Sequence, residues 1–284
     1  MKKFYRKATS KELKFYQKEV YSLQDKIFKI ASVYEDKIYL TGGTALSRFY
    51  FNHRLSEDLD FFTTTNDLKL IANDLIGRLK DEGFSIEINK LDVYFSRFTI
   101  DTQKFSLKIE LVKEHNQWGS LTKTAHNIFI NSLEDIGANK ITAFEDRAEF
   151  KDIIDLYYIT KKLTFDRLFE IAETKRIPIP YEELLTINTL GITGKVLMID
   201  NIDEQLLTNF VKELKLKTEE EIKKKEELAA RNLEKIIQRN LWDFPVEDRK
   251  LNQNSIPVLR RRLVNLPLPI RKALEKAILL TESY

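Results

Sequence analysis

Two aspartates, Asp58 and Asp60, stand two residues apart in a segment that alternates polar and apolar side chains, Asp58-Leu59-Asp60-Phe61. In a β-strand this spacing puts both carboxylates on one face and turns Leu59 and Phe61 towards the core. Carboxylates held side by side repel each other. The usual remedy is a hard divalent cation such as Mg²⁺, bound by one or two carboxylates together with substrate phosphates. The pair therefore predicts a magnesium site, against the plainer alternative of an exposed Asp-x-Asp at a strand end.

A glycine pair, Gly42-Gly43, follows residues 37–41, which read as a short buried strand. Glycine lets the backbone pass close to a phosphate, and a helix that starts there offers free N–H groups and the positive end of its dipole. Ala45 and Phe49 have the spacing of such a helix. The strand, glycine turn and helix together favour an anion site, although a glycine pair alone is more often a plain turn.

A third carboxylate, Glu110, lies in residues 105–112, where apolar and polar side chains alternate as in a strand. The alternation places Glu110 on the face opposite the apolar residues. It is therefore a candidate to complete a set of three metal ligands with Asp58 and Asp60. The alternatives are that Glu110 is a solvent-facing strand acid, or that Asp101 of the preceding strand supplies the third ligand.

Lys140 falls inside the apolar stripe of a helix predicted to start after Ser132, where a solvent-facing lysine would not stand. A buried ammonium group needs an anionic partner, because a charge loses much free energy when it loses water. The next helix supplies two acids, Asp152 and Asp155, three residues apart on one face. The position of Lys140 thus predicts either contact with a bound phosphate or a buried ion pair.

Arg54 and Ser56 precede the aspartate pair. Arg54 is a candidate for phosphate contact, with pairing to Glu57 or Asp58 as the alternative. The Ser56 hydroxyl lies on the approach to the metal strand, where it would stand near a bound phosphate, and its alternative is a plain turn serine.

The elements that must position these residues form a mixed half followed by a helical half. The periodicity predicts a helix over residues 10–30, strands over 37–41 and 58–61, a helix over 68–79, three mostly antiparallel strands over 84–88, 93–100 and 105–112, and helices after Ser132 and Glu149. Pro178 and Pro180 interrupt the chain soon afterwards. We therefore expect an α+β fold with a small mixed sheet flanked by helices in residues 1–165, and a mainly helical domain in residues 166–284.

Composition excludes several classes of protein. Apolar residues make up 43% of the 284 residues, and there are only 8 Gly and 6 Pro, which excludes disordered and low-complexity chains. The absence of Cys excludes disulfide frameworks, thiol nucleophiles and cysteine-based zinc sites. No apolar run is long enough for a membrane span or a signal peptide, so we expect a cytoplasmic protein that does not enter a membrane.

The charges are almost balanced, with 47 Lys and Arg against 44 Asp and Glu, but they are unevenly spread. Between Arg249 and Lys276 there are eight basic residues and one acid, Glu275. A solvated helix face is the ordinary explanation for such a segment. The alternative is a surface that binds the phosphates of a nucleic acid.

Several of these elements in this order resemble the AbiEii/AbiGii family of nucleotidyltransferase toxins, within the DNA polymerase β-like nucleotidyltransferase superfamily. The resemblance rests on Gly42-Gly43-Thr44-Ala45-Leu46, His53-Arg54, Ser56, Asp58-Leu59-Asp60-Phe61-Phe62, Lys140 and Lys151-Asp152-Ile153-Ile154-Asp155-Leu156-Tyr157, and covers about residues 35–160. It implies a nucleotidyltransferase fold for this half of the chain. It further implies that Gly42, Gly43, Thr44, Arg54, Ser56 and Lys140 contact the nucleotide, that Asp58 and Asp60 bind Mg²⁺ with Glu110 at the third position, and that Asp155 is the late catalytic acid.

The function implied by the resemblance is Mg²⁺-dependent transfer of NMP from an NTP to an RNA acceptor, often the 3′ end of tRNA. The enzyme would be the toxin of an abortive-infection system against phage, neutralised by a cognate antitoxin protein. Two alternatives remain open from the sequence. The acceptor is a protein or small-molecule hydroxyl, or the chain is a nucleotide-binding regulatory module that has lost catalysis.

Overall fold

The structure is a computed structural model, and it describes residues 4–143, 149–175, 181–185 and 195–243 together with Arg271, Lys272 and Glu275. The chain divides into two compact units, Met1–Lys215 and Leu216–Tyr284. The domain boundary predicted between residues 165 and 166 falls inside the first unit and stays a prediction. The basic segment from Arg249 to Lys276 lies mostly outside the described residues. Within those residues, no helix has the length and apolar character needed to cross a bilayer.

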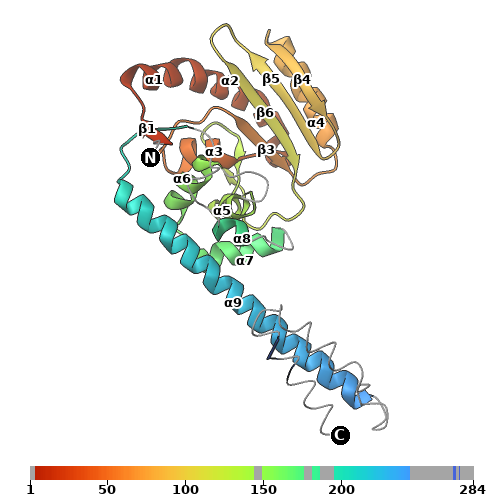
Figure 1. Cartoon of the computed structure of the whole chain (residues 1–284). Coiled ribbons are helices and arrows are strands. Elements are labelled where there is room, and N and C mark those ends of the chain that lie inside the picture. Colours follow the sequence, from red (N-terminus) through yellow and green to blue (C-terminus); the bar gives the residue numbers. More distant parts are fainter. Residues whose placement is uncertain are drawn as a thin grey trace. The chain divides into compact units, whose positions relative to one another are not determined.

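A seven-stranded mixed sheet, in the order β4-β5-β6-β3-β2-β8-β7, forms the centre of the first unit (Figure 1). Its strands are β2 (Tyr39–Thr41), β3 (Leu59–Thr63), β4 (Ser85–Leu91), β5 (Phe95–Asp101), β6 (Ser106–Lys113), β7 (Thr122–Lys123) and β8 (Phe129–Ile130). Strand β3 is antiparallel to β2 and parallel to β6, whereas β4, β5 and β6 are antiparallel. The predicted mixed architecture is confirmed. The two-residue strands β7 and β8 were not predicted, because they are too short to show an alternating pattern.

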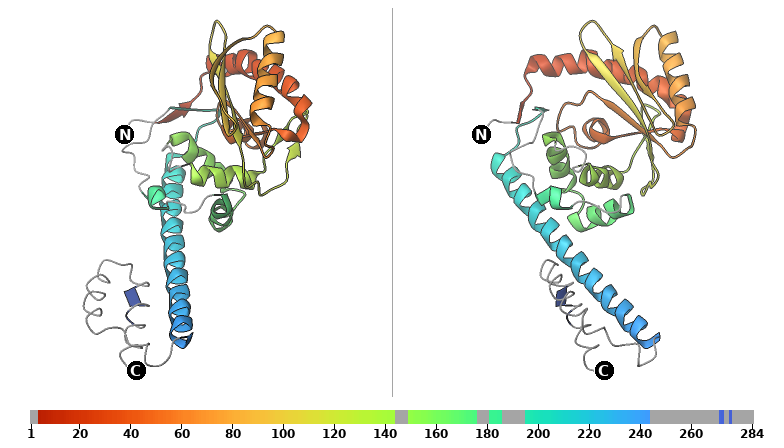
Figure 2. Two further views of the ribbon diagram at one scale, coloured as in Figure 1. Left: turned by 90° about the vertical axis from the view of Figure 1, so that its right-hand side faces the viewer. Right: turned by 45° about the vertical axis from the view of Figure 1, so that its right-hand side comes forward.

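The alternation of β3 separates a buried face from a functional one. Leu59 and Phe61 are 0% and 1% exposed, whereas Asp60 and Phe62, on the other face, remain partly accessible. The long helix α4 (Leu68–Asp81) packs on β4, β5 and β6 and against α2 (Tyr21–Ala31). Figure 2 shows α4, in orange, running alongside the sheet. One sheet face therefore belongs to the core, which leaves the Asp60 face for chemistry.

The helix predicted over residues 10–30 is present in three segments: α1 (Ser10–Phe15), the π-helical turn η1 (Tyr16–Val20) and α2, followed by the 3₁₀ segment η2 (Ser32–Lys37). Thr9 caps α1, because its side chain accepts a hydrogen bond from the N–H of Glu12 in a capping box. On α2, the buried Gln24 donates through Nε2 to the carbonyl oxygens of Ser56 (3.1 Å) and Glu57 (2.8 Å). The N-terminal helices thus hold the segment that leads into Asp58.

The remaining helices are α3 (Gly42–Ala45), continued by the π-helical turn η3 (Leu46–Tyr50), α5 (Leu133–Thr142), α6 (Phe150–Ile159), α7 (Phe165–Lys175), α8 (Tyr181–Leu185) and α9 (Glu204–Asp243). As predicted, Ser132 caps α5, where its Oγ accepts a hydrogen bond from the N–H of Asp135 at 3.0 Å. Helix α5 packs on both α6 and α7. This packing turns the Lys140 side of α5 towards the first turn of α6.

A two-stranded parallel ribbon joins β1 (Tyr5–Lys7) to β9 (Val196–Met198). Strand β9 also bonds the segment before the aspartate pair, because the N–H of Leu55 donates to the carbonyl of Leu197 at 2.8 Å. Neither three-residue strand was predicted. The ribbon brings Lys195, far along the sequence, beside residues 54–58.

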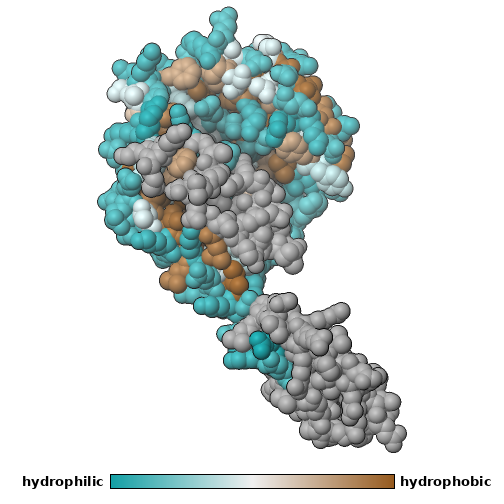
Figure 3. Space-filling view, viewed as in Figure 1, coloured by the Kyte–Doolittle hydropathy of each residue, from teal (hydrophilic) through white to brown (hydrophobic). Residues whose placement is uncertain are grey.

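The face of the first unit drawn in Figure 3 is largely hydrophilic, with apolar patches between the polar side chains. Exposed large apolar side chains, such as Leu70 on α4, Tyr94 between β4 and β5 and Leu206 on α9, are scattered over the fold. Scattered apolar side chains of this kind are normal on a protein surface.

Candidate functional site

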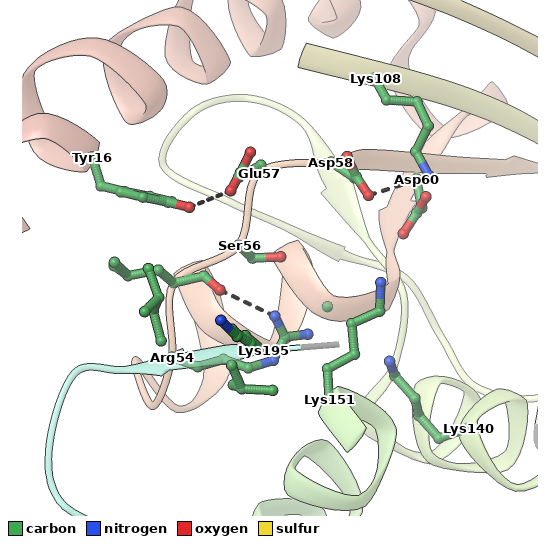
Figure 4. Close-up of a pocket in the computed structure, with 14 residues that line it drawn as sticks. Tyr16, Arg54, Ser56, Glu57, Asp58, Asp60, Lys108, Lys140, Lys151 and Lys195 are labelled. Atoms are coloured by element: carbon green, nitrogen blue, oxygen red, sulfur yellow. Dashed lines mark hydrogen bonds and ion pairs between the residues drawn. The ribbon is translucent and has the colours of Figure 1, made fainter. Parts of the chain in front are cut away.

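A cavity of about 310 Å³ opens beside the aspartate pair. Its charged lining residues are Arg54, Glu57, Asp58, Asp60, Lys108, Lys140, Lys151 and Lys195. Figure 4 shows the carboxylates of Asp58 and Asp60 on one side of this cavity, with Lys140, Lys151 and Lys195 across from them. The cavity therefore has an acidic wall and a basic wall.

The acidic wall is held by β3 and by a side-chain hydrogen bond behind it. Asp60 lies within β3, in register with Glu110 of the parallel neighbour β6. Asp58 stands directly before β3, where its backbone carbonyl accepts a hydrogen bond from Thr44 Oγ1. Thr44 Oγ1 also lies 2.9 Å from Ser56 Oγ, and because its single proton goes to the Asp58 carbonyl, it accepts this second hydrogen bond from the Ser56 hydroxyl. The Thr44 hydroxyl thus ties the glycine turn to the loop that carries Ser56 and Asp58.

Glu110 is held by two cations on its own face of the sheet. Arg97 Nη2 lies 2.7 Å from Glu110 Oε1, and Lys108 Nζ lies 3.3 Å from the same oxygen and 3.2 Å from Asp58 Oδ2. Although burial lowers it, the pKa of Lys108 is raised by the attraction of Asp58 and Glu110. Among the described residues, no group of three or more His or acidic side chains lies close enough to hold one metal ion. A three-carboxylate ligand set with Glu110 therefore stays a prediction.

The donor set nevertheless suits a hard divalent cation. Burial, with Glu110 and Asp58 adding to it, raises the pKa of Asp60 to about 6. Burial is the larger cause of this shift and the neighbouring carboxylates are the smaller one, and the Lys108 ammonium lies where it offsets part of their negative charge. Carboxylate oxygens are the ligands that Mg²⁺ takes, and one or two of them suffice when phosphates supply the rest. The pair Asp58 and Asp60 meets that requirement.

The two glycines lie against both charged walls. Gly42 has a φ of +68°, and a Cβ built there would stand 2.5 Å from Asp60 Oδ2. A Cβ on Gly43 would overlap the guanidinium of Arg54 and would stand 3.3 Å from Ser56 Oγ. The glycine pair is therefore required by the close approach of Asp60 and Arg54, whatever else binds there.

Replacing Gly42 by alanine is expected to destabilise the chain by more than about 1–2 kcal/mol, since the left-handed backbone alone costs an L-residue that much and Asp60 must also move. Gly77→Ala is the matched control. Gly77 lies within α4, and its Cβ would meet no atom within 4 Å. That change should stabilise the helix by about 0.5–1 kcal/mol. Denaturant unfolding of both variants checks this, and equal stabilities would contradict the assigned role of Gly42.

Lys140 and Asp155 lie in a buried network of charges. Lys140 is 4% exposed, and its Nζ is 2.5 Å from Asp152 Oδ1 and 2.7 Å from Asp155 Oδ2. Asp155, 0% exposed, accepts two hydrogen bonds from Arg54, at 2.7 Å from Nε and 2.8 Å from Nη2, and lies 2.8 Å from His53 Nε2. Lys140 thus has structural acids as partners and also reaches the cavity.

The contacts favour the charged forms of Arg54, Lys140 and Asp155. Burial alone would raise the pKa of Asp155, but Arg54 and Lys140 hold it well below its ordinary range. The nearby acids raise the pKa of Lys140 despite its burial, and burial lowers the pKa of His53. The alternative that Arg54 pairs with Glu57 or Asp58 is wrong, because its guanidinium is committed to an acid 101 residues away.

The structure divides the residues singled out from the sequence among three places. The 310 Å³ cavity is lined by Gly43, Arg54, Ser56, Asp58, Asp60 and Lys140. A second cavity, which shares Asp60 and Lys140 with the first, is lined by Gly42 and Glu110. Thr44 and Asp155 line neither cavity and lie behind the wall, where they hold other residues in place. The nucleotide, metal and catalytic roles of all these residues stay predictions.

Three cations of the site had no role assigned from the sequence. Lys108 shares the face of Glu110 in β6, and this alternation was a usable signal. Lys151 follows Glu149 at the start of α6, and its Nζ lies 2.8 Å from Glu149 Oε2. Lys195 arrives through the β1–β9 ribbon, for which no local pattern exists.

Comparison with known proteins gives a family match and one relative. The family described as "Nucleotidyl transferase AbiEii toxin, Type IV TA system" matches residues 27–239. An uncharacterized protein of Aquifex aeolicus (strain VF5) is 32% identical over 144 residues, and the match covers 45% of this chain and 60% of that protein. The chain therefore spans less than two thirds of the length of this relative.

Two solved structures resemble the chain more distantly. JHP933 from Helicobacter pylori is 20% identical, with 76% of this chain and 97% of that chain covered and a TM-score of 0.48. MenT4, a nucleotidyltransferase toxin from Mycobacterium tuberculosis H37Rv, is 12% identical. The match covers 68% of this chain and 80% of that chain, with a TM-score of 0.49.

Proposed function

We propose that this chain, which belongs to the AbiEii family of nucleotidyl transferase toxins, transfers a nucleoside monophosphate from an NTP to an acceptor hydroxyl in the 310 Å³ cavity. The observation that carries the proposal is the opposition of charges across that cavity. Two carboxylates suited to a divalent cation face a group of lysines suited to phosphates. A metal-bound triphosphate needs both kinds of wall at once.

The basic wall would hold the triphosphate. Lys195 is exposed and Lys151 half-buried at the cavity, whereas Lys140 is buried in its wall. Ammonium groups make strong charge-assisted hydrogen bonds to phosphate oxygens. Arg54 adds positive charge behind them, although its guanidinium hydrogen bonds go to Asp155. Lysines that converge from α5, from α6 and from the residue directly before β9 can contact several phosphate oxygens at once.

The acidic wall would hold Mg²⁺ through Asp58 and Asp60, and the bound ion would polarise the α-phosphate and offset developing charge. An acceptor oxygen attacks the α-phosphorus. As this P–O bond forms, the bond between the α-phosphorus and the α,β-bridging oxygen breaks, and pyrophosphate leaves. The hydroxyl proton passes to a carboxylate of the acidic wall, and the lysines stabilise the charge on the departing pyrophosphate.

The acceptor we propose is RNA, with the 3′ end of tRNA as its specific form. The family description as a toxin of a type IV toxin–antitoxin system supports a toxic activity and a cognate antitoxin protein as partner. The decisive experiment incubates the chain with Mg²⁺, each of the four labelled NTPs and total cellular RNA. Label in tRNA is the expected result. Label in protein would show that the acceptor is a protein and not RNA. The absence of pyrophosphate release with every NTP would overturn the proposed activity.

The basic segment between Arg249 and Lys276 remains a sequence-based prediction of an RNA-binding surface. Replacing Arg260, Arg261 and Arg262 by alanine is expected to weaken RNA binding and to reduce the slope of log affinity against log salt by about 2, since each single-strand phosphate contact contributes about 0.7. NTP binding should be unchanged. The control variant replaces residues 223–225, three lysines of α9, by alanine and so removes the same amount of positive charge from another part of the chain. Equal RNA affinity and salt slope in the arginine variant and its parent would contradict the prediction.

A further inference from the structure

A second cavity, of about 190 Å³, lies on the other side of Asp60 and Lys140, which line both cavities. It is formed by the end of β2, by β3 and β6, and by α5. The proposed transfer does not use it. Because it is smaller than the roughly 300 Å³ at which pockets for drug-sized ligands begin, it suits one flat portion of a ligand. Because the second cavity shares Asp60 and Lys140 with the first, a ligand portion bound in it would lie next to the α-phosphate.

The walls of the second cavity combine an apolar surface with polar side chains, among them the charged Asp60, Glu110 and Lys140. Phe62 and Val112 are direct neighbours across the parallel β3–β6 pair, and both point to the face that carries Asp60. Helix α5 contributes Ile136, and Ala143 follows at its end. An aromatic ring flanked by aliphatic groups is the kind of surface on which a nucleobase stacks, because every base has an apolar π-face.

One polar group in this cavity lacks a partner. Asn139 Nδ2 is buried, and it makes no hydrogen bond within the part of the chain that the structure describes. Asn139 is one residue before Lys140 on α5 and lines the cavity itself. A buried donor without an acceptor is costly, and such groups call for a specific explanation. A bound ligand with a hydrogen-bond acceptor atom next to Asn139 would explain this unpaired donor.

We infer that the second cavity binds a nucleobase, which lies against Phe62 and accepts a hydrogen bond from the Asn139 side-chain amide. The inference rests on the proposed function and deepens it, since it assigns the part of the site that distinguishes one base from another. Two sources offer the same chemistry. The base belongs either to the NTP or to the terminal nucleotide of the acceptor, and both lie next to the α-phosphorus during transfer.

The test measures base preference in the parent, Asn139→Ala and Asn139→Leu. Leucine keeps much of the asparagine volume and removes the unpaired donor, so this variant should fold at least as well as the parent. Asn89→Ala is the matched control, because Asn89 is exposed on β4, away from both cavities, and its side chain bonds to Glu87 and Thr99. In the first arm, each of the four α,β-methylene nucleoside triphosphates is titrated into the protein in the presence of Mg²⁺. These analogues cannot release pyrophosphate, so only binding is measured. The second titrates oligoribonucleotides that end in each of the four nucleotides.

The expected result is a base preference in the parent, in one arm, that falls by about tenfold or more in both Asn139 variants and is unchanged in Asn89→Ala. The arm that responds identifies the source of the base. Equal preferences in parent and variants in both arms, or no preference in the parent, would overturn the inference. Because binding is measured without turnover, the two proposals can fail separately. A base preference that depends on Asn139, found in a chain that transfers no nucleotide, would refute the proposed activity and support the nucleobase site.

Discussion

Asp58→Ala and Asp60→Ala are each expected to abolish nucleotidyl transfer while the chain stays folded. The two carboxylates line the acidic wall of the cavity, opposite the lysines that would hold the triphosphate. Removing one preorganised group that stabilises transition-state charge typically costs a factor of about 10²–10³. Loss of a ligand to the metal is expected to cost at least that much. The activity of each variant should therefore fall below detection in most assays.

Folding should survive because these carboxylates repel each other when no cation is bound. Burial and the neighbouring carboxylates of Glu110 and Asp58 raise the pKa of Asp60 to about 6, which shows that its charged form is disfavoured in the folded chain. A variant without one acid relieves that repulsion. Thermal unfolding in EDTA should thus give a midpoint for each variant no lower than that of the parent.

The matched control is Asp101→Ala, since Asp101, the alternative third ligand considered from the sequence, is an exposed acid at the end of β5 and lines neither cavity. Its loss should leave pyrophosphate release near the parent rate. Pyrophosphate release is measured with each NTP, Mg²⁺ and RNA for all three variants. Retained activity in both Asp58→Ala and Asp60→Ala would contradict the assignment of the acidic wall, whereas loss in Asp101→Ala as well would indicate a general effect of removing charge.

Asp155→Ala is expected to destabilise the chain by about 3–5 kcal/mol. Its carboxylate is completely buried and contacts Arg54, Lys140 and His53. Removing one partner of a buried ion pair leaves an uncompensated charge, and a loss of this size is usual in such cases. Since whole domains are stable by only about 5–15 kcal/mol, the variant should approach unfolding at moderate temperature.

Guanidinium unfolding of the parent and of Asp155→Ala gives the comparison, with Glu227→Ala as the control. Glu227 forms an exposed pair with Arg231 on α9, at 3.9 Å, and such pairs contribute less than about 1 kcal/mol. The result also bears on the catalytic role that the family resemblance implies for Asp155. A variant with parental stability and no activity would contradict the structural role and favour direct contact with substrate.

The stability that Asp155 contributes has a defined pH dependence. Burial opposes ionisation of Asp155, but Arg54 and Lys140 outweigh it and hold the pKa well below the ordinary range. The unfolded chain has the ordinary Asp pKa of about 3.9. The contribution is therefore fully present above about pH 4 and is lost as the pH falls from there towards the folded-state pKa. The difference in unfolding free energy between parent and Asp155→Ala should narrow over that acid range.

Local patterns were enough to predict the elements that carry the chemistry. The alternation around Asp58 and Asp60, the glycine pair after a short strand, the Ser132 cap and the inward position of Lys140 all follow from spacing along one segment. Each depends on the period of a strand or helix, which is a property of neighbouring residues. The mixed sheet and its three antiparallel strands could be predicted for the same reason, because their side chains alternate over five residues or more.

The tertiary structure alone decided which charges meet. Arg54 pairs with Asp155, 101 residues away, and no spacing rule connects them. Lys195 reaches the cavity only because three-residue strands, too short to show a pattern, form the β1–β9 ribbon. The sequence left two possible partners for Lys140, a bound phosphate or a nearby acid. The packing of α5 on α6 places two carboxylates in contact with it. Periodicity specifies which side of an element a residue occupies, whereas its ionic partner depends on how distant elements pack.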